Sequence, residues 1–131
     1  MVVTYFISGH RNITEEEFNK NYAEQLSFIK ENMKKGYYKF VIGDYYGVDI
    51  MAQNYLIDNL NIDPEHITIY HMFDSPRNCH PKIKNLVGGF KSDEERDSAM
   101  TKNSDLDIAF VRDHNKWSGT AANILRRKLL K

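Results

Sequence analysis

The chain of 131 residues contains a single cysteine, a single tryptophan and three prolines, and its formal net charge is zero. One cysteine, Cys79, excludes an intramolecular disulfide and favours a reducing compartment. No apolar run approaches the length that a membrane span needs. The apolar start, residues 1–8, also lacks the charged beginning of a signal peptide. We therefore expect a cytoplasmic protein that does not contact membranes.

The charge balance and the histidine spacing also argue against two classes of partner. Eighteen Lys and Arg residues are matched by eighteen Asp and Glu residues, whereas a general nucleic-acid binder normally carries a basic excess. The five histidines are scattered without zinc-type spacing, and Cys79-His80 is a pair of ligands without further partners. We expect no nucleic acid, no metal and no cofactor.

Strand-like and helix-like segments alternate along the chain. Short β-branched or aromatic runs predict strands at residues 2–8, 39–42, 66–72 and 106–111. Capping boxes at Thr14 and Ser92 and apolar stripes at steps of three and four predict helices over about 14–35, 48–56, 92–102 and 118–130. Residues 75–90 show no period and predict a loop.

This order predicts one α/β domain over residues 1–131. It is a Rossmann-like, three-layer fold with a central, mostly parallel sheet and helices on both faces. Ligands of such sheets bind outside the carboxyl ends of the strands. Four segments occupy those ends, namely residues 9–12, 43–49, 74–96 and 113–120.

The first two strand ends carry glycine-rich turns. Gly9, His10 and Arg11 follow the first strand, where a glycine permits close backbone approach and an arginine suits a phosphate. A polar turn without a ligand explains the same residues.

The second turn offers two glycines and two carboxylates, Gly43, Asp44, Gly47 and Asp49. The carboxylates suit ribose hydroxyls, and the tyrosines between the glycines suit stacking on a base. Alternatively, Asp49 only stabilises the first turn of its helix.

The last two strand ends open helices. Glu95, Arg96 and Asp97 are candidate catalytic residues, although Glu95 also suits the ordinary role of cap partner to Ser92. Arg96 opposes the helix dipole, so a carboxylate or an anionic ligand must offset it.

Ser118, Gly119 and Thr120 offer hydroxyl and backbone donors for a phosphate or ribose, or simply an N-cap. All four strand ends therefore suit one anionic ligand.

The set of motifs resembles the SLOG superfamily, which groups Rossmann-like proteins related to the Lonely Guy (LOG) enzymes and to DprA and Smf proteins. The matching segments, in chain order, are Gly9-His10-Arg11, Gly43-Asp44-Tyr45-Tyr46-Gly47-Val48-Asp49, Arg96 with Met100, residues 105–111, and Gly119-Thr120. The resemblance covers nearly the whole chain and is closest to small stand-alone members. It implies a nucleotide or nucleotide-derived ligand and a homo-dimer or higher homo-oligomer.

The resemblance leaves the reaction open. LOG relatives hydrolyse the N-glycosidic bond of a nucleoside monophosphate with an E-R-K helix start and a G-T-x-E-E turn, and related deoxyribosyltransferases use a glutamate nucleophile. This chain has Asp97 in place of that lysine and Asn123 in place of that glutamate. An amide cannot act as a nucleophile or base as a carboxylate does.

Three alternatives follow. The chain is a sensor or sequestering module; or it is an N-glycosidase in which another carboxylate replaces the glutamate; or it is an accessory nucleic-acid protein like DprA. The candidate replacements are Asp44, Asp49, Glu94, Glu95 and Asp97.

Overall fold

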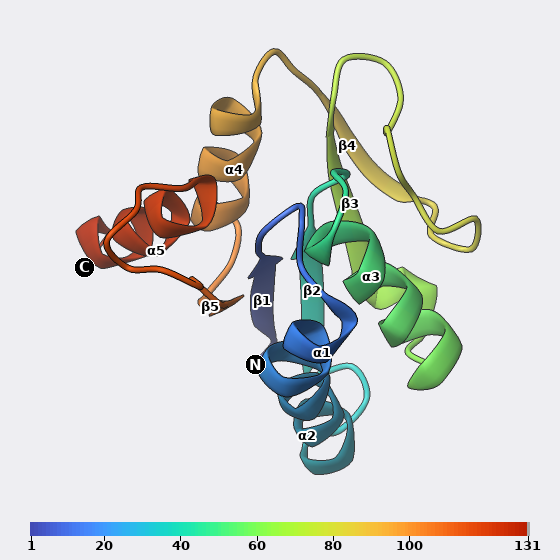
Figure 1. Ribbon diagram of the computed structural model, residues 1–131. Coiled ribbons are helices and arrows are strands. Elements are labelled where there is room, and N and C mark those ends of the chain that lie inside the picture. The colour runs from blue at the N-terminus through green and yellow to red at the C-terminus, as the bar shows by residue number, and fades with distance from the viewer. Residues whose placement is uncertain (131) are drawn as a thin grey trace.

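A single parallel sheet organises the molecule. The computed structural model describes residues 1–130, and its five strands lie in the order β4-β3-β2-β1-β5 with every neighbouring pair parallel (Figure 1). The strands are β1 (Val3–Ser8), β2 (Tyr38–Ile42), β3 (Ile67–Met72), β4 (Asn85–Phe90) and β5 (Leu106–Ala109). The predicted three-layer, Rossmann-like α/β fold is confirmed, and the sheet is wholly parallel.

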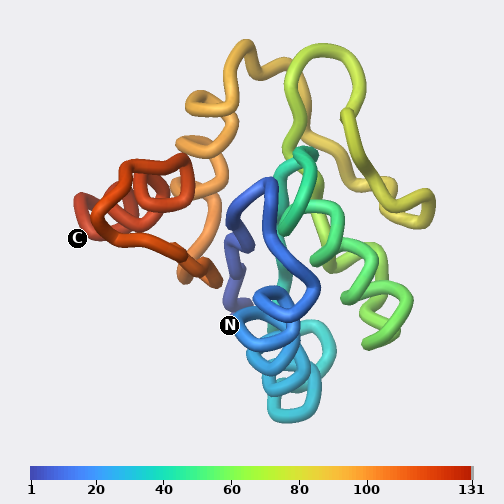
Figure 2. The backbone as a smooth tube through the Cα atoms, viewed as in Figure 1, coloured from blue at the N-terminus to red at the C-terminus, as the bar shows by residue number. Residues whose placement is uncertain are grey.

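Helices cover both faces of this sheet. They are α1 (Glu15–Phe18), α2 (Glu24–Asn32), α3 (Val48–Asn54), α4 (Asp93–Lys102) and α5 (Gly119–Leu129), with the π-helical turns η1 (Asn19–Ala23) and η2 (Tyr55–Asn59) and the short 3₁₀ turn η3 (Pro64–His66). The path of the chain in Figure 2 shows α1, η1 and α2 as one continuous helical segment. No helix within residues 1–130 is long and apolar enough to cross a membrane.

The two faces of the sheet carry cores of unequal size. Successive residues of a strand point to opposite faces, so Ile7 joins the larger core beneath α1 to α3, whereas Phe6 joins a smaller one. The smaller core consists of Phe6, Val41, Tyr70 and Met100 of α4. Because this second face is covered less completely, space remains beside Phe6 and Met100 at the ends of the strands.

The helix starts follow the predicted caps. Thr14 accepts a hydrogen bond from the Glu17 backbone N–H, and the Glu17 carboxylate accepts one from the Thr14 N–H, so the predicted capping box is present. The Ser92 and Ser118 hydroxyls cap α4 and α5 by accepting from the Glu95 and Ala121 N–H groups. The predicted capping box at Ser92 is only half formed, because the Glu95 carboxylate accepts from the Lys91 N–H instead of the Ser92 N–H. Each cap satisfies backbone donors that a helix start otherwise leaves free.

The predicted loop over residues 75–90 is wrong in its last third, because Asn85–Phe90 forms β4. This strand lies at the edge of the sheet and is exposed along most of its length, so it lacks the apolar pattern of a buried strand. It also contains Gly88, where a side chain would collide with the ring of His71. The predicted fourth strand, residues 106–111, is shorter and ends at Ala109.

The order of the strands places a crevice at one end of the sheet. From β1 the chain moves outward through β2 and β3 to β4, and then returns to β5 on the other side of β1. The direction of winding therefore reverses between β1 and β5. Connecting loops diverge at such a point and leave a crevice outside the carboxyl ends of the two strands.

Candidate functional site

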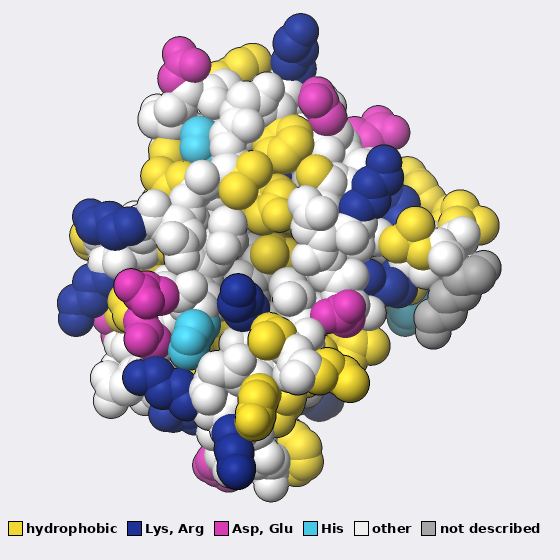
Figure 3. Space-filling view, turned by 180° about the vertical axis from the view of Figure 1, so that it is seen from behind, with side chains coloured by type: hydrophobic (Ala, Val, Ile, Leu, Met, Phe, Trp, Pro, Cys, Tyr) yellow, Lys and Arg dark blue, Asp and Glu magenta, His cyan; other side chains and the backbone are white. Residues whose placement is uncertain are grey.

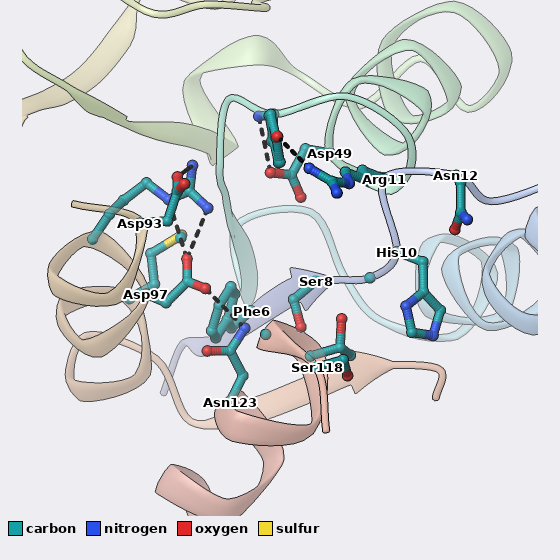
Figure 4. A pocket seen from close by; sticks show the side chains of 16 residues that line it. Phe6, Ser8, His10, Arg11, Asn12, Asp49, Asp93, Asp97, Ser118 and Asn123 are labelled. Atoms are coloured by element: carbon teal, nitrogen blue, oxygen red, sulfur yellow. Dashed lines mark hydrogen bonds and ion pairs between the residues drawn. The ribbon is translucent and has the colours of Figure 1, made fainter. Parts of the chain in front are cut away.

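A cavity of about 400 Å³ occupies this crevice. Its walls come from the β1–α1 turn, the β2–α3 turn, α4 and the start of α5 (Figure 4). The lining residues are Phe6, Ser8, Gly9, His10, Arg11, Asn12, Tyr45, Asp49, Asp93, Arg96, Asp97, Met100, Ser118, Gly119, Thr120 and Asn123. A volume of this size suits a small organic ligand.

Most of the predicted site residues meet at this cavity. Nine of them line it, namely Gly9, His10, Arg11, Asp49, Arg96, Asp97, Ser118, Gly119 and Thr120. Four others, Gly43, Asp44, Gly47 and Glu95, do not. These four support the wall from behind or cap a helix.

Tyr22 ties the two central strands together at the crevice. Its buried hydroxyl donates to the Ser8 carbonyl at 2.8 Å and accepts from the Phe110 N–H at 2.9 Å. The same hydroxyl packs against Gly9, where a side chain would collide with it and with Val48. Burial raises the pKa of Tyr22. Gly9 is therefore required by packing against Tyr22, in addition to its place in the cavity wall.

The side chain of Ser8 is buried without a partner. It projects into the cavity and is only 6% exposed (Figure 4). Its hydroxyl makes no hydrogen bond within residues 1–130. An unpaired buried hydroxyl costs about 1–3 kcal/mol, so the hydrogen-bonding capacity of this atom is free for a molecule in the cavity.

His10 and Arg11 form the wall beside β1. The backbone N–H of Arg112 donates to His10 Nε2 at 3.0 Å, so this nitrogen is an acceptor. Burial and the nearby Arg112 guanidinium lower the pKa of His10, which keeps the ring neutral at neutral pH. Arg11 is exposed and donates to the Tyr45 hydroxyl at 2.9 Å.

The second turn is joined to the first through its glycines. Gly47 has a φ of 70° and lies against the backbone of His10 and Arg11, a position that a side chain would fill. The Val48 N–H donates to the His10 carbonyl at 3.2 Å. A Cβ at Gly43 would lie 2.6 Å from Asp49 Oδ2 and 2.9 Å from Arg96 Cζ. Gly43 therefore allows these two charged groups to approach the same point of the backbone.

Asp44 is fully buried behind the cavity wall. Its carboxylate accepts from Arg77 at the backbone N–H, Nε and Nη2, and from Arg96 Nη1 at 2.7 Å. These hydrogen bonds and positive charges outweigh burial and lower the pKa of Asp44. Asp44 thus links the β2–α3 turn to the β3–β4 connection and to α4, and its oxygens face protein rather than the cavity.

Arg96 is a partner of carboxylates. Its side chain is 6% exposed, and its Nη1 lies 2.7 Å from Asp44 and 3.2 Å from Asp93, while Nη2 lies 2.9 Å from Asp97. These carboxylates offset the unfavourable position of a cation near the start of a helix. Glu95 belongs to the cap, because its N–H donates to Ser92 and its carboxylate accepts from the Lys91 N–H.

Asn123 is the residue that the predicted resemblance matches to the glutamate nucleophile of the deoxyribosyltransferases. Its amide nitrogen donates to Asp97 Oδ2 at 3.2 Å, and its carbonyl oxygen accepts from Arg126. A glutamate here would place a second carboxylate against Asp97. The amide fits this position because it donates to one charged neighbour and accepts from the other.

Asp49 is the carboxylate of the cavity wall with the fewest hydrogen-bond partners. It lines the cavity, is 6% exposed and accepts from the Tyr45 backbone N–H at 3.0 Å. Burial raises its pKa to about 7, although the Arg96 guanidinium opposes this shift. A carboxyl that exchanges its proton near neutral pH is a candidate acid or base.

Several residues of the site were not predicted from the sequence. Arg77 lies in the connection from β3 to β4 and stacks over the Tyr45 ring, with Cζ 4.6 Å from the centroid. Tyr22 was predicted only as part of a helix stripe, and Ser8 only as the last residue of a strand. No local pattern marks these three, because their roles arise from partners far along the chain.

Comparisons with known proteins gave no match. No protein-family model matches the chain, and no significant match was found among curated proteins or solved structures. The SLOG resemblance therefore stays a prediction. Over the residues that the structure describes, no group of three or more His, Cys, Asp or Glu side chains is arranged to hold a metal ion.

Proposed function

We propose that the protein binds a nucleotide or nucleotide-derived ligand in the cavity between β1 and β5, as a cytoplasmic sensor or sequestering module. The buried, unpartnered hydroxyl of Ser8 carries this proposal. It lies at the switch point of a parallel sheet, where α/β proteins bind such ligands.

The start of α5 suits the phosphate of such a ligand. The Ser118 hydroxyl accepts from the Ala121 N–H, and the first-turn N–H groups of Gly119 and Thr120, which have no acceptor within the helix, belong to residues that line the cavity. The space around Gly119 is open, with nothing within 4 Å of the point where a Cβ would lie. Backbone donors and the positive end of the helix dipole together favour an anion here.

Arg11 supplies an exposed positive charge at the same mouth. It is the exposed guanidinium of the cavity wall, and its observed partner is the neutral hydroxyl of Tyr45. Arg96, in contrast, is surrounded by carboxylates and holds the wall together. The ligand's anionic end is therefore expected between Arg11 and the start of α5.

Hydrolysis of an N-glycosidic bond is the second candidate, and Asp49 favours it. A buried carboxyl with a pKa of about 7 is able to donate a proton to a leaving base at neutral pH. Against it stands Asn123, which provides no carboxylate nucleophile. Binding without turnover is the result that we expect.

The test combines a thermal-shift panel with chromatography. Nucleoside mono-, di- and triphosphates, ADP-ribose and cyclic nucleotides are incubated with the purified protein, and free base is measured in the same mixtures. A ligand at a hundred times its Kd stabilises the fold by about 2.7 kcal/mol. A shift with intact ligand supports binding, and released base supports hydrolysis. No shift with any compound contradicts the proposal.

Two serine variants make this test specific. Ser8→Ala removes the unpartnered hydroxyl, so we expect the free protein to keep its stability and the ligand-induced shift to fall. Ser27→Ala is the matched control, because Ser27 bonds the Tyr55 hydroxyl away from the cavity. It should lower stability slightly and leave the ligand-induced shift unchanged.

We also propose a homo-oligomer that uses the outer side of α5. A groove between α4 and α5 adjoins the cavity, and hydrophobic side chains gather along α5 at the right edge of Figure 3. Trp117 is 72% exposed and Leu129 is 74% exposed on this side. Sedimentation of the wild type and of Leu129→Glu tests the assembly, since a charge in a buried apolar interface would dissociate it.

A further inference from the structure

Four carboxylates and two guanidiniums form one cluster in the cavity wall and directly behind it. Arg77 contacts Asp44 and Asp93, and Arg96 contacts Asp44, Asp93 and Asp97. Asp49 is the fourth carboxylate, close to Arg96 across Gly43. The cluster therefore holds more carboxylates than guanidiniums, and its buried carboxylates, such as Asp44 and Asp49, require hydrogen-bond donors.

Asp49 is the carboxylate of this cluster that still has unused hydrogen-bond acceptor positions. Asp44 and Asp97 each accept several hydrogen bonds from guanidinium or amide groups. Asp49 accepts from the backbone of its own turn, and over residues 1–130 it receives no hydrogen bond from either guanidinium. An ionised carboxylate has room for about four hydrogen bonds. Its remaining acceptors face the cavity (Figure 4).

The donor that completes Asp49 is a neutral one. The Arg96 guanidinium already lies beside Asp49 at the Gly43 backbone, so a neutral donor is sufficient to fill the remaining acceptor positions of the carboxylate. Hydroxyl groups are neutral, and a pair of neighbouring hydroxyls can donate to both oxygens of one carboxylate. The unpartnered Ser8 hydroxyl opens into the same cavity and offers a further polar contact to such a group.

We propose that Asp49 reads the vicinal hydroxyls of a ribose, so that the site selects ribonucleotide-type ligands over their 2′-deoxy counterparts. This inference rests on the proposed function, because it concerns the sugar of the ligand whose phosphate lies at the start of α5. It makes Asp49 a specificity-determining residue of the cavity and leaves Asp44 as part of its supporting wall.

Ribose selection by Asp49 is coupled to protonation. Charged or titratable groups face Asp49 from three elements, namely Arg96 and Asp97 of α4, Asp44 of the β2–α3 turn and Tyr22 of η1. Burial raises the pKa of Asp49 to about 7, so the free protein must release a proton before the carboxylate accepts both hydroxyls. For this pKa, the affinity for a ribose falls about tenfold from pH 8 to pH 6.

The test measures Kd for the four ribonucleoside 5′-monophosphates, each paired with its 2′-deoxy counterpart, by calorimetry at pH 6 and pH 8. At pH 8 the wild type should prefer the ribose member of at least one pair by about tenfold or more, as expected for hydrogen bonds to a charged group. The preference should weaken at pH 6. The second ionisation of the phosphate is common to both members and cancels in their ratio.

Two carboxylate-to-amide variants assign the effect. Asp49→Asn keeps the shape and the Tyr45 hydrogen bond, and should reduce the ribose preference to about twofold at both pH values. Asp105→Asn is the matched control, because Asp105 also accepts a backbone hydrogen bond, from the Thr4 N–H, but does not line the cavity, and it should keep the preference.

The outcomes separate this inference from the proposed function. Equal affinity for both members of every pair, or a preference that survives in Asp49→Asn, overturns the inference while nucleotide binding stands. Absence of binding by every compound in the wider panel overturns both.

Discussion

Replacing Asp49 by asparagine should make the protein more stable at alkaline pH. The carboxyl of Asp49 is 6% exposed, and its pKa is raised from 3.8 to about 7 by burial. A shift of this size corresponds to about 4 kcal/mol between the protonated and ionised forms. The asparagine side chain has the same shape as the protonated carboxyl and cannot ionise.

The direction of this change in stability with pH follows from proton binding to Asp49. Between about pH 4 and pH 7 the folded chain holds a proton on Asp49 that the unfolded chain has already released, so the wild type loses stability as pH rises through this range. Above pH 7 the full cost of the buried charge is present. Asp49→Asn should therefore match the wild type near pH 4 and exceed it by about 4 kcal/mol at pH 8.

Urea unfolding followed by circular dichroism at pH 4.5, 6 and 8 measures this difference. With an m-value of roughly 2 kcal/mol/M, the midpoint at pH 8 should rise by about 2 M. Asp74→Asn, at an exposed position, controls for the change in net charge and should shift the midpoint little. A difference between Asp49→Asn and wild type that is the same at all three pH values would refute the reasoning.

Three further substitutions test the framework of the site. Tyr22→Phe removes the hydroxyl that joins the ends of β1 and β5 and leaves a buried N–H and a carbonyl unpaired. It should lower the free energy of unfolding by about 1–3 kcal/mol in urea titrations, and an unchanged midpoint would contradict this. Gly43→Ala forces Asp49 and Arg96 away from the backbone, so we expect lower thermal stability together with weaker ligand binding. If both properties are unchanged, the two side chains can move without loss of stability or affinity, and the prediction is wrong. Ser118→Ala removes the cap of α5 and should lower the free energy of unfolding by about 1 kcal/mol while moderately weakening nucleotide binding; normal binding in this variant would argue against a phosphate at the helix start.

The loss of stability that ionised Asp49 causes is also relevant to function. A neutral side chain at this position would make a more stable protein at neutral pH, yet the chain places a carboxyl there in a cavity wall. Residues that lower stability in this way are common at sites where chemistry or binding requires them. The stability measurement and the ribose-selection measurement therefore both depend on the ionisation of Asp49.

Local patterns sufficed to predict the class of fold and the end of the sheet at which the cavity lies. The alternation of strand-like and helix-like segments predicted the parallel sheet, and its carboxyl ends do carry the cavity. Ser118 illustrates why, because an N-cap depends on residues three or four positions apart and is visible in the sequence. The strand β4 escaped prediction because an exposed edge strand with two glycines has no hydrophobic period.

Tertiary structure decided which charged residues face the cavity. Asp44 and Asp49 stand five positions apart in one turn and looked equivalent, yet Asp44 is enclosed by Arg77 and Arg96 from distant segments, whereas Asp49 opens into the cavity. Arg96 likewise became a structural ion-pair partner through those contacts. Whether a charge is available to a ligand depends on its burial and on partners brought together by folding, and these contacts between segments 33 and 52 residues apart leave no trace in local sequence.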